Sequence, residues 1–205
     1  MKNLKKYAAA ILCGGRSQRM GADKAFLRDS LGNLLLAQSA ERLATWFGRV
    51  LFVTDDPRKL EPYPELAPYA AIKDQHPLSG PVGAIRTALL ASPGQAVFVL
   101  AGDQPTIELE IILKLRDLLE KTKADVVLPC HEGVIEPLYA FYGSQCAAVF
   151  QESLLQNKLA IRQSFPSLVV QRLALEPQTL AQGLFKNLNT PEEAQAMGYK
   201  PTDRH

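Results

Sequence analysis

The chain has 205 residues, of which 47% are hydrophobic and 21% charged, the composition of an ordinary folded protein rather than a disordered one. Its 23 basic and 21 acidic residues leave a formal net charge of +2, which argues against a broad nucleic-acid-binding face. Any attraction for anions must therefore be local.

Cysteine usage and hydropathy indicate the compartment. Cys13, Cys130 and Cys146 are widely spaced and form no C-x-x-C pair, so the sequence predicts neither a disulfide framework nor a zinc site. A basic start followed by apolar residues imitates a secretory signal, but the uncharged run over 7–13 is too short. No stretch reaches the roughly 18 apolar residues of a membrane span. We expect a cytoplasmic protein that uses neither a membrane nor a nucleic acid.

Apolar runs and helix-period segments alternate along the first two thirds of the chain. The runs predict strands buried on both faces, and hence central in a sheet, at 7–13, 49–54, 69–73, 96–102 and 124–129. Two amphipathic helices are expected between them, at 34–47 and 107–121. Their predicted buried stripes are Leu36, Ala40, Leu43 and Phe47 in the first helix, and Ile112, Leu115 and Leu119 in the second.

The pattern changes after residue 130. Strands are predicted at 134–143, 168–175 and 184–188, and a helix at 144–156, so we expect the sheet to become mixed. A last helix at 189–197 has Thr190 as N-cap, Pro191 at its first position and Glu193 completing a capping box. These elements predict an α/β fold, Rossmann-like, with three α/β/α layers and a mainly parallel mixed central sheet.

The stretch "AILCGGRSQRMGADKAFL" (10–27) joins flexible backbone to positive charge directly after the first strand. Ligands of open α/β sheets lie beyond the carboxyl ends of the strands, where glycines allow close approach and cations pair with phosphate oxygens. The spacing fits neither a P-loop nor the dinucleotide G-x-G-x-x-G motif, and a plain polar turn remains an alternative. The glycines are Gly14, Gly15 and Gly21, and the cations are Arg16, Arg19 and Lys24.

This order resembles the signature of the MobA-like nucleotidyltransferases, which reads roughly L-x-G-G-x-S-x-R-M-G-x-D-K. The resemblance continues through "DQHPLSGPVGAI" (74–85), "FVLAGDQP" (98–105), "EPLYAFY" (136–142) and "FKNLNTPEE" (185–193), and so covers nearly the whole chain. It implies a nucleotide-diphospho-sugar transferase-like fold and a Mg²⁺-dependent transferase. The pattern is closest to members that transfer GMP from GTP to the phosphate of Mo-molybdopterin and release pyrophosphate.

The resemblance also implies roles for individual residues. Catalysis falls to Arg19, Lys24 and Asp103. Nucleotide binding falls to Leu12, Cys13, Gly14, Gly15, Arg16, Ser17, Lys24, Thr54, Asp74, Gly80 and Asp103. Acceptor binding falls to Lys158, Arg162 and Asn187, and metal binding to Asp103 and Asn189. We expect one domain over residues 1–205, with nucleotide binding in the part up to about 130 and acceptor binding in the remainder.

Local readings compete with these roles. Asp74 and Asp103 each follow a predicted strand, where a carboxylate can cap the next helix, and the late asparagines can serve turns. Lys158 and Arg162 would share one face of a helix, which can be an ordinary solvated face.

Alternatives of function also remain. Within the same fold the acceptor and base can differ, as in a molybdenum cofactor cytidylyltransferase, and Asp55 and Asp56 depart from the family pattern near the base. A non-catalytic GTP- or pterin-binding carrier would release no pyrophosphate. Transient contacts with molybdenum-insertion proteins and molybdoenzyme chaperones are expected from the resemblance.

Overall fold

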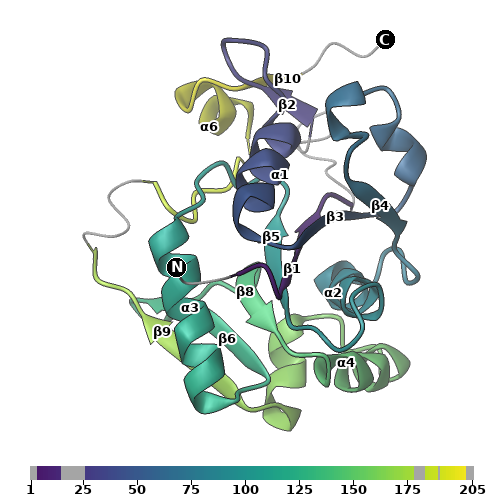
Figure 1. The fold of residues 1–205 in the computed structure, drawn as a ribbon, viewed down its shortest axis with the longest axis vertical. Helices are drawn as coiled ribbons and strands as arrows, with labels where there is room; N and C mark the ends of the chain where they lie inside the picture. Colours follow the sequence, from purple (N-terminus) through teal and green to yellow (C-terminus); the bar gives the residue numbers. More distant parts are fainter. Residues whose placement is uncertain (1–3, 15–25, 178–182, 189, 202–205) are drawn as a thin grey trace.

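The fold is a twisted sheet between two helical layers (Figure 1), in a computed structural model that describes residues 4–14, 26–177, 183–188 and 190–201. The main sheet has eight strands in the order β4-β3-β1-β5-β8-β6-β7, and β9 pairs with β6. The strands that run in one direction are β4 (Ala70–Lys73), β3 (Arg49–Thr54), β1 (Ala8–Leu12), β5 (Val97–Ala101), β6 (Val126–His131) and β9 (Val170–Ala174). Two strands run against them, β8 (Tyr139–Tyr142) and β7 (Val134–Ile135). The mixed, mainly parallel sheet is therefore confirmed.

Three sequence-based expectations about strands are wrong. The strand expected at 69–73 is an edge strand, because β4 pairs only with β3 among the described residues and its side chains alternate between partly buried and exposed. The strand expected at 134–143 is split into β7 and β8, which both pair with β6. Pro137 has no N–H to donate to a ladder, and it lies in a turn between the two strands. The stretch 184–188 forms a turn and extended chain rather than a strand.

Helices cover both faces of the sheet. The helices α1 (Leu35–Trp46) and α3 (Leu109–Thr122) pack on one face, and α2 (Gly80–Leu90) and α4 (Cys146–Leu155) on the other (Figure 1). The predicted stripes of the two amphipathic helices are buried, as expected. Period-two alternation divides each central strand between the layers, so that Phe98 faces α1 and α3 while Val97 and Val99 face α2 and α4.

The amino edge of the sheet is occupied by helix C-termini. Lys5 Nζ donates to the carbonyls of Ala44 (2.9 Å) and Phe47 (3.0 Å) at the end of α1. Arg49 Nη1 donates to the carbonyl of Ala91 (2.6 Å) at the end of α2. Both cations therefore balance the partial negative charge of a helix C-terminus, and they line an open hollow of about 280 Å³ at this edge.

Smaller elements complete the chain. The short 3₁₀ helices are η2 (Pro57–Leu60), η3 (Pro64–Leu66) and η4 (Ile161–Ser167). The last helix, α6 (Pro191–Ala196), has the predicted capping box: Glu193 N donates to Thr190 Oγ1 (3.2 Å) and Thr190 N donates to Glu193 Oε2 (2.9 Å). It lies beside the pair β2 (Leu27–Arg28) and β10 (Lys200–Pro201) at the top of Figure 1.

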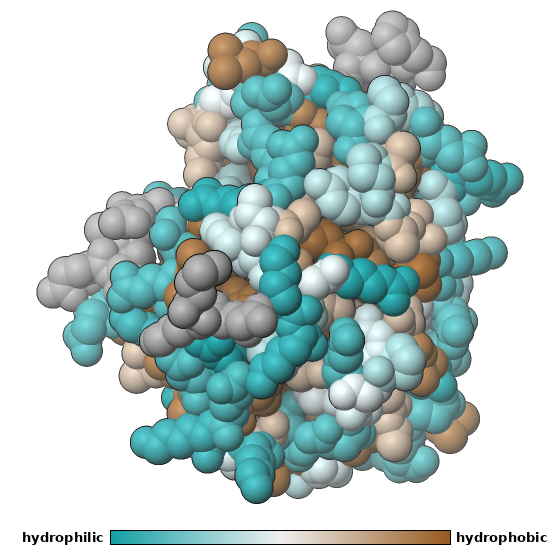
Figure 2. All heavy atoms as spheres, in the orientation of Figure 1, coloured by the Kyte–Doolittle hydropathy of each residue, from teal (hydrophilic) through white to brown (hydrophobic). Residues whose placement is uncertain are grey.

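The visible surface is mostly hydrophilic, with apolar residues scattered between polar ones (Figure 2). Within the described part of the chain, no helix has both the length and the apolar character to cross a membrane.

Candidate active site

Most of the predicted nucleotide-binding residues that the structure describes lie where four neighbouring parallel strands end. Backbone hydrogen bonds continue the sheet past these ends: Cys13 N donates to Val53 O (2.9 Å), and Gly102 N donates to Leu12 O (2.9 Å). Asp74 N donates to Thr54 O (2.7 Å) in the same way. The segments that follow β4, β3, β1 and β5 therefore leave the sheet side by side, as the sequence predicts for a ligand site at the carboxyl edge.

Gly14 is the last described residue before the cationic loop, and it packs tightly against the end of β3. A Cβ on Gly14 would lie 2.9 Å from Asp55 N and 3.2 Å from Thr54 Cα, both of which are backbone atoms. Glycine is required here for close packing between neighbouring strand ends. The predicted site residues Gly15, Arg16, Ser17, Arg19 and Lys24 lie outside the described residues.

Cys13 has the role expected of a small buried thiol. Its side chain is buried, and Sγ lies 3.6 Å from the carbonyl oxygen of Val53. Leu12 is partly buried and packs with the layer of α2 and α4. Both residues therefore pack their side chains into the protein at this edge of the sheet.

Asp74 is held in place by a threonine thirteen residues further along the chain. Its Oδ1 accepts from His76 N (2.9 Å) and from Thr87 Oγ1 (3.1 Å), and Thr87 Oγ1 in turn accepts from Gln75 N (3.2 Å). Asp74 and Thr87 are both buried. Asp74 does not cap α2, because the N-cap position is Ser79. Thr87 carried no local sequence signal, since it reads as an ordinary helix residue.

The two acids after β3 are paired with nearby cations. Burial raises the pKa of Asp55, but the hydrogen bond and charge of Lys59 outweigh it and hold that pKa below its usual value. Hydrogen bonds from Arg58 lower the pKa of Asp56 to about 2. Asp55 and Asp56, where the sequence departs from the expected family pattern, are therefore two carboxylates whose charges are each paired with a cation. The hydroxyl of Thr54 is used internally, because it donates to Asp55 Oδ1 (3.2 Å).

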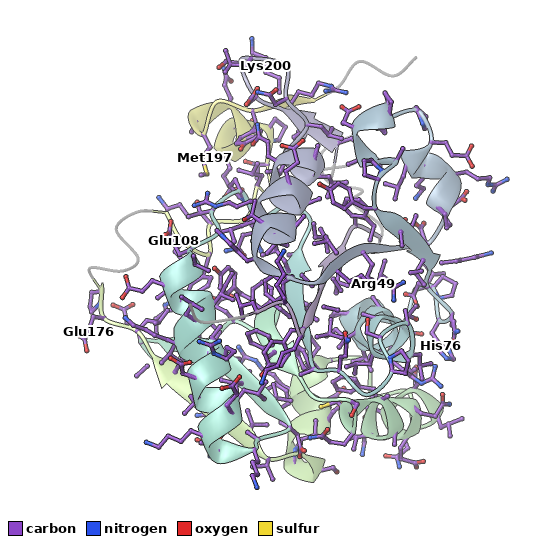
Figure 3. All side chains as sticks on the ribbon, viewed as in Figure 1. Arg49, His76, Glu108, Glu176, Met197 and Lys200 are labelled. Carbon is purple, nitrogen blue, oxygen red and sulfur yellow. The ribbon has the colours of Figure 1, made fainter. Side chains whose placement is uncertain are left out.

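The backbone leading into helix α2 at this edge is strained. Leu78 and Gly80 have positive φ angles of 71° and 61°, a conformation that favours glycine. Ser79 makes no side-chain cap. Gly83 packs on the preceding loop, because a Cβ there would lie 2.9 Å from His76 O. His76 lies beside α2 (Figure 3).

Asp103 follows β5, and the late asparagine segment lies beside it. Leu188 N donates to Asp103 O (3.0 Å), which places Asn187 next to Asp103 although 84 positions separate them in the sequence. Asp103 does not cap the next helix, because α3 has Glu108 at its N-cap position (Figure 3). Asn189 lies outside the described residues.

The oxygens at this point suit a hard divalent cation. Asn187 Oδ1 is buried and has no hydrogen-bond partner within the described part of the chain, while the Asp103 carboxylate is two residues past the end of β5. No group of three or more His, Cys, Asp or Glu side chains in the described ranges could hold a metal ion. Mg²⁺ commonly uses only one or two protein carboxylates, with the remaining ligands from phosphates and water. The residues present therefore fit a nucleotide-bound metal.

Aromatic and charged side chains that the sequence analysis did not select lie at the same edge. His131 Nε2 is 2.9 Å from Glu136 Oε1, and the His131 ring stacks on Phe185 with centroids 5.5 Å apart and planes 9° from parallel. Phe185 also meets the edge of Tyr139 at 5.3 Å. The sequence analysis did not select Phe185, because it predicted a strand at 184–188.

The predicted acceptor-binding cations are not on one helix. The helix α4 ends at Leu155, since Asn157 takes a positive φ of 55°. Lys158 lies in the loop that follows, and Arg162 in η4. Both side chains are exposed. This loop reaches the start of α2, where the carbonyl oxygen of Leu159 would lie 3.3 Å from a Cβ on Gly80.

The sequence matches one family and several named proteins. A family model described as the MobA-like NTP transferase domain matches residues 9–169. Molybdenum cofactor guanylyltransferase of Syntrophotalea carbinolica is 31% identical over 193 residues, which span 93% of this chain and 90% of that protein. The probable molybdenum cofactor guanylyltransferase of Natranaerobius thermophilus is 29% identical over 191 residues, or 91% of this chain and 92% of that protein.

Solved structures agree with this sequence match. Molybdopterin-guanine dinucleotide biosynthesis protein A from Archaeoglobus fulgidus has a TM-score of 0.80 at 26% identity, and the match covers 93% of this chain and 96% of that one. A Mycobacterium tuberculosis protein solved as a complex with manganese has a TM-score of 0.56 at 13% identity, covering 83% of this chain and 89% of that one. The second likeness is one of fold.

Proposed function

Because the chain belongs to the MobA-like NTP transferase family and is a nucleotidyltransferase, we propose that it transfers GMP from GTP to the phosphate of Mo-molybdopterin and releases pyrophosphate. The observation that carries the proposal is the gathering of Gly14, Asp74, Asp103 and Asn187 at one edge of the sheet. Relatives at about 30% identity, named for this reaction and matching nearly the whole chain, support the choice of substrates.

In the proposed reaction, a phosphate oxygen of the acceptor attacks the α-phosphorus of GTP in line with the leaving pyrophosphate. The acceptor is already an anion, so the chain's task is to hold two repelling phosphates in line and to stabilise the developing charge. We assign that charge stabilisation to Arg19, Lys24 and backbone amides of the glycine-rich loop.

Mg²⁺ would be held by Asp103 and Asn189, and Asn187, which the sequence analysis grouped with the acceptor-binding residues, would be a neighbouring oxygen donor. When bound, the ion neutralises charge on the transferred phosphoryl group and on pyrophosphate. The unpartnered Oδ1 of Asn187 beside the Asp103 loop supports this assignment. The manganese complex of a fold relative supports a divalent ion in general.

The base and the acceptor are assigned to different groups of residues, which the structure places at α2 and in the loop and 3₁₀ helix after α4. Asp74 would accept from the N1–H and N2–H₂ groups of guanine, and Thr87 fixes the carboxylate for that contact. Lys158 and Arg162 would bind the acceptor's phosphate. On this division the part up to about 130 binds the nucleotide, and the rest binds the acceptor and contributes the two asparagines to the metal. The reaction would take place in the cytoplasm, where cofactor carriers and molybdoenzyme chaperones would meet the protein.

The deciding experiment supplies each of the four NTPs with the acceptor and measures pyrophosphate. Of the four nucleotides, we expect only GTP to give pyrophosphate release in the presence of the acceptor. Pyrophosphate release with CTP instead would identify a cytidylyltransferase, and GTP binding without pyrophosphate release would identify a carrier. Lys24→Ala should lower kcat/KM by about 10²-fold, as expected on losing one preorganised charge-stabilising donor. The matched control is Lys121→Ala, on the exposed face of α3, which should stay within twofold.

A further inference from the structure

The aromatic group at the carboxyl edge forms a clamp around Phe185. On one side the His131 ring stacks on Phe185 nearly parallel, at 5.5 Å between centroids. On the other side Tyr139 meets Phe185 edge-on at 5.3 Å. Aromatic pairs in these two arrangements are favourable beyond the area they bury. Phe185 is therefore fixed from two sides.

Both sides of the clamp are anchored in the sheet. Tyr139 is fully buried in β8, and its hydroxyl accepts from Glu108 N (2.9 Å) at the start of α3. His131 ends β6, and its Nε2 donates to the Glu136 carboxylate, since an ionised carboxylate can only accept. Glu136 is held through its backbone, because its N–H donates to Pro129 O (3.0 Å). The two rings that hold Phe185 have little freedom to move.

The clamp holds a backbone that would not stay in place by itself. Phe185 has a positive φ of 67°, a left-handed conformation that a bulky side chain rarely adopts. Such a conformation persists where surrounding contacts over-determine it, and it is found disproportionately at functional sites. The ring contacts of His131 and Tyr139 supply those constraints together with the turn hydrogen bond from Lys186 N to Gly183 O (3.2 Å).

The position of Phe185 affects the oxygen atoms proposed to bind the metal, because they lie within three residues of it or beside that segment. Asn187, with its unpartnered buried Oδ1, is two positions beyond Phe185, and Leu188 N–H donates to Asp103 O. A segment that turns at Phe185 and is bonded at Leu188 presents Asn187 in one place. Loss of the first constraint would leave Leu188 as the anchor, through its hydrogen bond to Asp103 and its fully buried side chain, with Asn187 free to turn before it.

We propose that His131 is a positioning residue, which, oriented by Glu136, holds the Phe185 ring and so keeps Asn187 beside Asp103. The inference rests on the proposed function in one respect, the metal at Asp103. His131 itself touches neither the metal nor the phosphates in this proposal. It acts through the ring and backbone of Phe185.

The first test measures the exchange rate of the Leu188 amide hydrogen, which reports its hydrogen bond to Asp103 and needs no substrate. In His131→Ala and Phe185→Ala we expect that rate to rise tenfold or more. His131→Phe keeps a stacking ring without the bond to Glu136 and should restore most of the protection. The matched control is Trp46→Leu, which removes a partly buried ring at the far end of α1 and should leave Leu188 unchanged.

The second test measures Mn²⁺ affinity by electron paramagnetic resonance, with a GTP analogue whose α,β-bridging oxygen is a methylene group so that no transfer occurs. Removing a partner that orients a metal ligand typically weakens metal affinity by about 10–100-fold, and we expect at least tenfold for His131→Ala. His131→Phe should stay within threefold of the unmodified protein, and Trp46→Leu should match it.

Unchanged Leu188 exchange in both alanine variants would overturn the clamp. Faster exchange with unchanged Mn²⁺ affinity, in a protein where Asp103→Asn does weaken Mn²⁺ binding, would overturn the positioning role. If Asp103→Asn leaves Mn²⁺ affinity intact, the metal site of the proposed function fails instead, and Leu188 exchange alone then decides whether His131 holds the segment.

Discussion

Thr87→Val tests whether the buried hydroxyl of α2 fixes the Asp74 carboxylate. Valine has the shape of threonine without the hydroxyl, so the substitution removes the donor to Asp74 Oδ1 (3.1 Å) and the acceptor for Gln75 N (3.2 Å). Hydrogen bonds to charged groups contribute about 1.5–3 kcal/mol and neutral ones about 1 kcal/mol, so the unfolding free energy should fall by about 3 kcal/mol. For a chain of this length, that is a decrease in Tm of roughly 6–12 °C.

The measurement is thermal and urea unfolding at pH 7, with Thr45→Val as the matched control. Thr45 is exposed on α1, and its hydroxyl donates to Arg42 O (2.7 Å), so its loss should change the unfolding free energy by less than about 0.5 kcal/mol. Equal stabilities of the two variants would refute the structural role of Thr87. Should Asp74 also contact the base as proposed, Thr87→Val will weaken GTP binding while Thr45→Val will not.

Three further predictions concern Gly14, the buried tyrosines and Cys146. Gly14→Ala should lower both stability and GTP affinity, because its Cβ would lie 2.9 Å from Asp55 N; calorimetric GTP titration equal to the unmodified protein would contradict this. Burial raises the pKa of Tyr139 and of Tyr142 above the ordinary value near 10, so only the unfolded chain loses these protons as the pH passes 10. Unfolding free energy should therefore fall from that pH upward, and absorbance at 295 nm should show both phenols neutral until unfolding. Burial raises the pKa of Cys146 to about 12, so a disulfide reagent at pH 8 should label this thiol in urea and leave it unlabelled in the folded protein.

The order of the elements was predictable because hydrophobic periodicity is a local property. The stripe of α1 and the capping box at Thr190 need only neighbouring residues, and both are in the structure as expected. The predictions that failed concern features that depend on residues distant in the sequence. The run at 69–73 has the composition of a central strand, yet no described strand lies beyond β4, and composition does not encode which strand is last.

The edge of the sheet where the described candidate residues meet was predictable from the sequence, and their mutual contacts only partly. Strand ends such as those before Asp74 and Asp103 can be read from sequence, because the carboxyl edge follows from a parallel sheet. Thr87 could not be found in this way, since its importance comes from a hydrogen bond across thirteen positions. Phe185 was missed because the apolar residues of "LFKNL" resemble a short strand, whereas the segment is a turn with a left-handed Phe185 that contacts rings distant in the sequence.

The reversed direction of β8 gives this architecture room to diversify. Because β8 runs against β5 and β6, its first residue, Tyr139, reaches the edge where β5 and β6 finish. The hairpin turn at Glu132 and Gly133 therefore lies at the same edge of the sheet as the loops that follow the early strands. The two groups of loops belong to separate stretches of the chain. Insertions in the hairpin can accumulate over evolutionary time without disturbing the register of β1, β3, β4 and β5. The hairpin can therefore change on one side of this edge while the strands before Gly14, Asp74 and Asp103 keep their pairing.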